Sequence, residues 1–148
     1  MLRKFRDYFR TPTNGLLILT LFSFCIYLSL ETITRMFNLF FYFPPIDIFL
    51  HFFSGMAFYF LFFWFMGFYT KKIKFRHLWS FALTFTFAIF WEIGEAIQEL
   101  FVYNPPYLQD FFFWDGFFDI FWTLVASYVS FLIISKLRKK GKFLSREI

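Results

Sequence analysis

The chain has 148 residues, enough for one domain, and 59% of them are hydrophobic, with a mean hydropathy of +0.58. Aromatic residues make up 30% of the chain, and 31 residues are phenylalanine. A water-soluble core of this size could not enclose so much apolar surface, so these values exclude an ordinary soluble domain and indicate a lipid environment. The net charge of +5 does not indicate nucleic-acid binding, because the basic residues form short clusters beside long apolar segments.

Four apolar segments follow one another along the chain, at residues 15–35, 46–69, 78–101 and 112–135. Each is close to the roughly 20 residues that an α-helix needs to cross about 30 Å of hydrocarbon. Pro44-Pro45 and Asn104-Pro105-Pro106 separate neighbouring segments, as expected of sequences that interrupt helices. The sequence therefore predicts an all-α fold, a four-helix transmembrane bundle that forms a single membrane domain over residues 1–148.

The basic residues predict the orientation of this bundle. Three clusters hold 14 of the 15 basic residues, and with an even number of spans all three lie on the same side of the membrane. Because Lys and Arg accumulate in cytoplasmic loops, we expect both termini to be cytoplasmic and the protein to reside in the cell (inner) membrane. The clusters are Arg3, Lys4, Arg6 and Arg10; Lys71, Lys72, Lys74 and Arg76; and Lys136, Arg138, Lys139, Lys140, Lys142 and Arg146.

Most acidic residues lie at the opposite ends of the predicted helices. With a rise of about 1.5 Å per residue, Glu92 lies roughly 24 Å beyond Arg76, and Asp119 lies roughly 26 Å before Lys136. His51 falls in the same layer, near the extracytoplasmic boundary, whereas His77 beside Arg76 is expected to be solvated at the cytoplasmic boundary. The acidic residues on the extracytoplasmic side are Glu31, Asp47, Glu92, Glu95, Glu99, Asp110, Asp115 and Asp119.

Helical spacing places these polar residues on one face of each helix. Polar stripes in lipid turn inward to meet one another, so we expect an acidic cup that opens outward. Gly55, one turn beyond His51, is a position where a neighbouring backbone could approach closely. The stripes are Glu31 and Arg35; Asp47 and His51; Glu92, Glu95 and Glu99; and Asp115 and Asp119.

Simpler roles are open for several of these residues. Asp47 follows Pro44-Pro45 and could cap the second helix. Asp110 and Asp115 lie near the start of the fourth helix, where the helix dipole favours negative charge. Arg35 is spaced to neutralise Glu31 within one turn of helix.

The glutamates of the third helix call for another explanation, because they approach a helix C-terminus, where the dipole opposes carboxylates. Such a group must bind a cation, hold a proton or pair with a base. Carboxylates together with histidine suit a divalent cation such as Mg²⁺, Mn²⁺, Fe²⁺ or Zn²⁺. The candidate catalytic residues are Glu92, Glu95 and His51, and the candidate cation ligands are Glu92, Glu95, Asp119, Asp115, His51 and Asp47.

The chain resembles the VanZ-like and YjdF-like small bacterial membrane proteins over roughly residues 47–131. The matching residues are Asp47, His51 and Gly55; Trp91-Glu92 and Glu95; Trp114-Asp115 and Asp119; and the Gln109-Asp110 pair before them. The family has no settled biochemical activity. The member that gives it its name is associated with tolerance of glycopeptide antibiotics, which act on the external cell wall, and this agrees with a site that faces outward without identifying a substrate.

Three functions are compatible with an outward-facing acidic layer. The first is cation-dependent action on, or recognition of, an envelope lipid or a cell-wall precursor. The second is ion or proton translocation, which needs a polar route through the cytoplasmic half, although residues 78–90 contain no ionisable side chain. The third is a structural or accessory membrane subunit without catalysis, for which the acidic stripes would point away from one another. The sequence alone leaves open whether the protein is an enzyme.

Overall fold

The computed structural model describes residues 12–103 and 109–139. The described ranges are helical and contain no strand, and four of their helices are long and apolar enough to cross a membrane. The predicted all-α four-helix bundle is therefore confirmed. The helices are α2 (Pro12–Met36), α3 (Leu39–Tyr42), α4 (Ile46–Met66), α5 (Ile73–Tyr103) and α6 (Gln109–Lys139).

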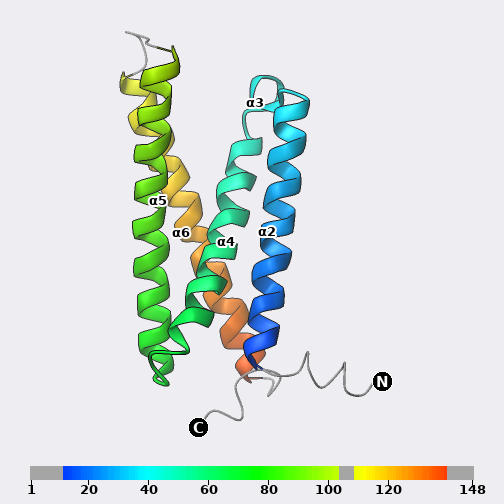
Figure 1. The fold of residues 1–148 in the computed structure, drawn as a ribbon, viewed down its shortest axis with the longest axis vertical. Coiled ribbons are helices and arrows are strands. Elements are labelled where there is room, and N and C mark those ends of the chain that lie inside the picture. The colour runs from blue at the N-terminus through cyan, green and yellow to red at the C-terminus, as the bar shows by residue number, and fades with distance from the viewer. Residues whose placement is uncertain (1–11, 104–108, 140–148) are drawn as a thin grey trace.

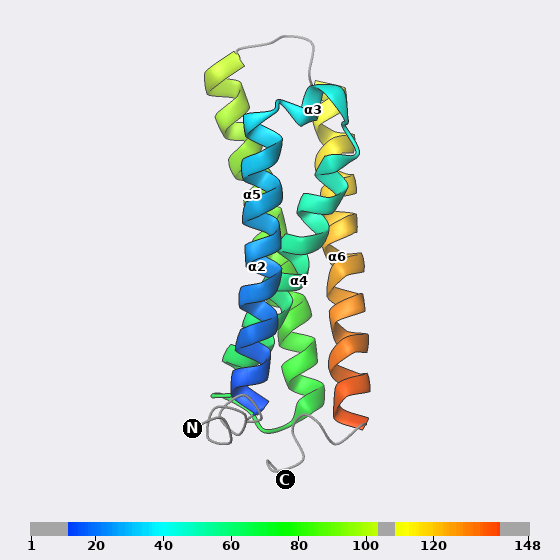
Figure 2. The ribbon, with the colours of Figure 1, turned by 90° about the vertical axis from the view of Figure 1, so that its right-hand side faces the viewer.

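Helix α4 is the centre of the bundle. It packs against α2, α5 and α6, while α5 also packs against α6 and the short α3 joins α2 to α4. The start of α2 and the end of α6 lie at the same end of the bundle as the connection between α4 and α5 (Figures 1 and 2). The described basic residues other than Arg35 are therefore gathered at that end, which we call the basic end.

The most buried part of the core lies in the half nearer the basic end. Tyr59, Phe60 and Phe63 of α4 are fully enclosed and pack with Leu16 of α2 and Ile134 of α6. Most other large apolar side chains of the described helices face outward, as expected when the surrounding solvent is hydrocarbon.

A close approach of α4 to α6 occurs at Gly55, as predicted. A Cβ atom at this position would lie 2.8 Å from the carbonyl oxygen of Thr123 and 3.1 Å from the Cβ of Ala126. Only glycine allows the two backbones to approach this closely. Thr123 uses the short separation to donate a hydrogen bond from Oγ1 to the carbonyl oxygen of His51, at 3.4 Å.

The basic end differs from expectation at two residues. The sequence placed the third span from about residue 78, whereas α5 begins at Ile73, so Arg76 and His77 lie inside the helix. Arg76 is buried; its guanidinium donates to the carbonyl oxygen of Phe63 and lies over the Phe63 ring. His77 was predicted to be solvated, but it packs inside the bundle instead. Its Nδ1 atom is 2.7 Å from the Tyr59 hydroxyl, and its ring packs on Phe63.

Candidate functional site

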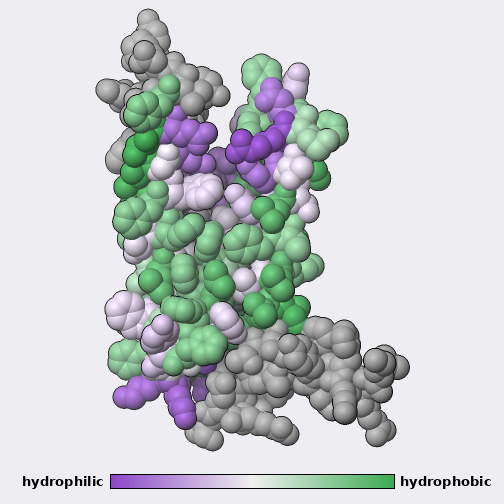
Figure 3. Space-filling model, in the orientation of Figure 1, coloured by the Kyte–Doolittle hydropathy of each residue, from purple (hydrophilic) through white to green (hydrophobic). Residues whose placement is uncertain are grey.

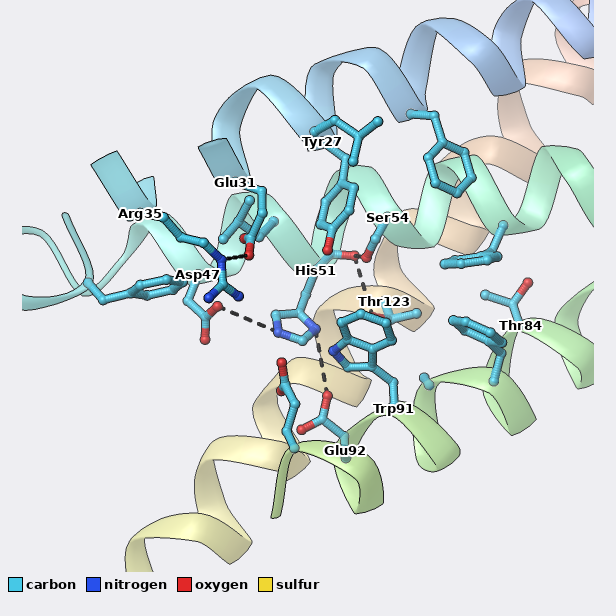
Figure 4. Close-up of a pocket in the computed structure, with 18 residues that line it drawn as sticks. Tyr27, Glu31, Arg35, Asp47, His51, Ser54, Thr84, Trp91, Glu92 and Thr123 are labelled. Carbon is cyan, nitrogen blue, oxygen red and sulfur yellow. Dashed lines mark hydrogen bonds and ion pairs between the residues drawn. The ribbon is translucent and has the colours of Figure 1, made fainter. Parts of the chain in front are cut away.

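One histidine and four carboxylates converge between α4, α5 and α6, at the end of the bundle opposite the basic end. Figure 4 shows His51 between Asp47 on one side and Glu92 on the other. The acidic stripes of these three helices therefore meet inside the bundle, as the first hypothesis requires and the accessory-subunit hypothesis does not. The converging residues are Asp47, His51, Glu92, Glu95 and Asp119.

Each ring nitrogen of His51 faces its own set of carboxylates. Nε2 is 3.6 Å from Oδ1 of Asp47 and 3.6 Å from Oδ1 of Asp119. Nδ1 is 3.7 Å from Oε1 of Glu92. The ligand atoms of Asp47, His51 and Asp119 all lie within 4.8 Å of one another, and so do those of His51, Glu92 and Glu95. The imidazole thus lies between two groups of potential cation ligands.

The distances between the His51 nitrogens and the carboxylate oxygens can be compared with those of a hydrogen bond and of a metal site. They exceed the roughly 2.7–3.2 Å of an N–H···O hydrogen bond. Two donors bound to one ion through bonds of about 2.1 Å are separated by roughly 3.0–3.4 Å. A shift of a few tenths of an ångström would therefore bring His51 and each of Asp47, Asp119 and Glu92 to the spacing of two ligands on one cation.

Three members of the cluster are largely withdrawn from water, whereas Glu95 is exposed and the side chain of Asp47 is 29% exposed. The side chain of Asp119 is 8% exposed, that of His51 12% and that of Glu92 15%. Grouping carboxylates at such low exposure is costly unless a cation or a proton compensates their charge. Among the residues that the structure describes at this end, Arg35 is the only fixed positive charge; it is exposed and pairs with Glu31, as predicted.

Small and hydroxyl-bearing residues near the cluster explain how α4, α5 and α6 come close enough for these side chains to meet. Gly55 holds α6 against α4, which brings Asp119 beside the histidine one turn away on α4. Gly116 of α6 leaves room for α5, because a Cβ there would lie 3.1 Å from Oε2 of Glu92. Ser54 and Thr123 both donate hydrogen bonds to the carbonyl oxygen of His51.

Sequence reasoning did not identify Gly116, Ser54 or Thr123 as supports of the site. The only available signal was the position of Gly116, a small residue within an apolar helix, three residues before Asp119. The two hydroxyl residues gave no signal of their own, because serine and threonine are common in membrane helices and usually bond to their own backbone.

Of the six predicted cation ligands, Asp115 alone lies apart from the cluster. Asp115 is exposed and belongs to neither ligand group. Asp47 makes no capping hydrogen bond at the start of α4 and faces His51 instead. The side chains of Glu99 and Asp110 lie outside the part of the chain whose side chains the structure describes.

The Glu92 side of the cluster opens into a pocket of about 320 Å³. This volume is at the lower end of the roughly 300–1,000 Å³ typical of small-molecule sites. Helices α2 and α5 form its walls and α4 its floor, and hydrophilic residues line the notch between the upper parts of α2 and α5 (Figure 3). The Glu92 side of the site is therefore open between α2 and α5.

A bundle of four membrane-length helices with a histidine and carboxylate site near one end defines a small multi-pass membrane protein. A family model described as "Predicted membrane protein (DUF2238)" matches residues 2–140, so the chain belongs to the DUF2238 family. This match supports a family of small membrane proteins but not the VanZ-like or YjdF-like resemblance in particular. A search of curated proteins and a search of solved structures found no match.

Proposed function

We propose that this protein binds a divalent cation at His51 and uses it to recognise, or act on, an envelope lipid or a cell-wall precursor at the outer face of the cell (inner) membrane. The orientation follows from the basic end, which the positive-inside rule assigns to the cytoplasm together with both termini. The acidic site then faces the extracytoplasmic side.

One observation carries the cation proposal: both ring nitrogens of His51 face carboxylates. A neutral imidazole has one nitrogen lone pair, so it binds one ion, and histidines that bind metals usually donate the other N–H to a carboxylate. We assign the ion to Nδ1 with Glu92 and Glu95, because both glutamates line the pocket, whereas Asp119 of the other group does not. The Nε2–H then faces Asp47 and Asp119, each 3.6 Å away, and their negative charge orients the ring.

This ligand set favours Zn²⁺, Mn²⁺ or Fe²⁺, which accept imidazole together with carboxylates, over Ca²⁺, which prefers oxygen alone. Two glutamates and one histidine leave coordination positions for a substrate oxygen. An ion there would polarise a phosphoryl or carbonyl oxygen, and the exposed Glu95 is placed to exchange protons with a bound molecule. Glu92, Glu95 and His51 are the proposed catalytic residues if the protein is an enzyme.

Support for an envelope substrate comes from the position of the site and from the resemblance to VanZ-like and YjdF-like proteins. The polar part of the pocket is at the acidic end of the four spans, where a surrounding bilayer would place a lipid headgroup or the lipid-linked part of a precursor. Translocation is less well supported, because the fully enclosed Tyr59, Phe60 and Phe63 fill the bundle between the site and the basic end. An accessory role does not explain why the carboxylates converge on a histidine. A proton relay can use such a group, but it would need a polar path to continue through this apolar core.

The test is cation retention by the purified protein in detergent. After dialysis against Zn²⁺ or Mn²⁺, inductively coupled plasma mass spectrometry should find about one ion per chain in the wild type and a large loss in H51A and E92Q. D115N is the matched control, because it removes a carboxylate from the same end of the bundle but outside both ligand groups. Equal retention by wild type, H51A and E92Q would overturn the proposal.

A further inference from the structure

The pocket beside the cation site has a polar end and an apolar end. The polar end holds Glu31 and Arg35 of α2 together with Asp47, His51, Glu92 and Glu95. Toward the middle of the bundle the lining becomes apolar and aromatic, with the Phe58 ring between those of Phe24 and Phe87, at 5.5 Å and 3.9 Å from their centroids. The gradient along the pocket parallels that of the bilayer, from headgroup to acyl chain.

The pocket lies where two helices do not pack together. Helix α2 packs against α3 and α4, and α5 packs against α4 and α6, so α2 and α5 enclose the pocket from either side without joining across it. Figure 1 shows them diverging toward the acidic end, and Figure 3 shows the resulting notch. A lipid could enter sideways from the surrounding leaflet and keep its normal orientation.

We propose that this pocket binds an acyl phospholipid of the outer leaflet, an inference that rests on the cation site proposed above. The phosphate contacts the ion held by His51, Glu92 and Glu95, and one acyl chain lies along Phe24, Phe58 and Phe87.

Metal coordination favours a phosphate over an uncharged headgroup. Carboxylates alone would repel an anion, but a divalent ion neutralises the two glutamates that bind it and presents open coordination positions to phosphate oxygens. Arg35, at the mouth of the pocket, has more donors than its pair with Glu31 uses, and a guanidinium binds phosphate well. Lipid binding should therefore depend on the cation.

The test is native mass spectrometry of the protein in detergent micelles, with Zn²⁺ or with EDTA. The probes are dioctanoyl phosphatidic acid, inorganic phosphate and dioctanoylglycerol. We expect the wild type with Zn²⁺ to retain one phosphatidic acid molecule, and to bind the other two probes at least about tenfold more weakly. EDTA should abolish the retention of phosphatidic acid.

One substitution tests the acyl-chain end of the pocket. A88F fills the apolar part of the pocket and should abolish lipid retention without loss of Zn²⁺, whereas I93F, on the outer surface of the same helix, should retain both.

The outcomes separate this inference from the cation proposal. Zn²⁺ retention with no lipid bound, or lipid binding unaffected by A88F, overturns the inference and leaves the cation site standing. Equal binding of inorganic phosphate and phosphatidic acid also overturns it, because the chain would then contribute nothing. Failure of the wild type to retain Zn²⁺ overturns both proposals.

Discussion

The close contact between α4 and α6 leads to a quantitative prediction for Gly55. In G55A the new Cβ would lie 2.8 Å from the carbonyl oxygen and 3.0 Å from the Cα of Thr123, and these backbone atoms cannot move without α6. The helices must separate, and overpacking of this kind costs about 1–3 kcal/mol. Separation also carries Asp119 away from His51, so G55A should lower both stability and Zn²⁺ retention.

Gly94 of α5 provides the matched control, because a Cβ there meets nothing within 4 Å. G94A should be neutral or stabilising by up to about 1 kcal/mol, the difference in helix propensity between the two residues. Unfolding of both variants in mixed micelles, monitored by circular dichroism as denaturing detergent is added, measures the difference. If G55A is as stable as G94A and retains as much Zn²⁺, the contact does not position the site as described.

Two further predictions concern the core and the charge of the site. Y59F removes the hydroxyl that lies 2.7 Å from Nδ1 of His77 and should cost about 0.5–2 kcal/mol in the same unfolding assay, whereas Y128F, at an exposed position, should cost nothing measurable; equal costs would contradict the buried pair. The effect of E92Q on the free energy of unfolding should change sign when the cation is added. Without the cation, E92Q removes repulsion between carboxylates and should stabilise the protein by about 1 kcal/mol. With Zn²⁺ at 100 times its dissociation constant, E92Q should lose about 2.7 kcal/mol of the stabilisation that the bound ion gives the wild type. A thermal shift that keeps the same sign with and without Zn²⁺ would show that Glu92 is not a ligand.

The sequence was sufficient for the four helices and for the layer of acids, because both follow from one-dimensional patterns. Apolar segments of membrane length have few alternatives to a helix, and a rise of about 1.5 Å per residue converts sequence position into depth. Glu92, Glu95 and His51 were selected in this way, and the structure brings them together.

Helical phase alone could not decide which member of a stripe points inward. Asp115 and Asp119 are one turn apart on α6, yet only Asp119 reaches His51. Asp115 lies two turns beyond Thr123, the residue that contacts α4 at Gly55, and is exposed at the end of the bundle. This difference depends on where two helices touch, which no single-helix pattern contains.

The environment of His77 and Arg76 was missed for a related reason. A cluster of basic residues predicts a boundary, but long basic side chains can extend along a helix while their charged groups find partners. Arg76 finds the carbonyl oxygen and ring of Phe63, which the bend between α4 and α5 places beside it. That partner is 13 residues away in the sequence and follows only from tertiary structure.

The most direct test of the account is an experimental structure of the protein grown with Zn²⁺, with diffraction measured on both sides of the zinc absorption edge. We predict one anomalous peak between Nδ1 of His51 and the carboxylates of Glu92 and Glu95. A map with no peak at this position, or with the carboxylates turned outward into solvent, would contradict it.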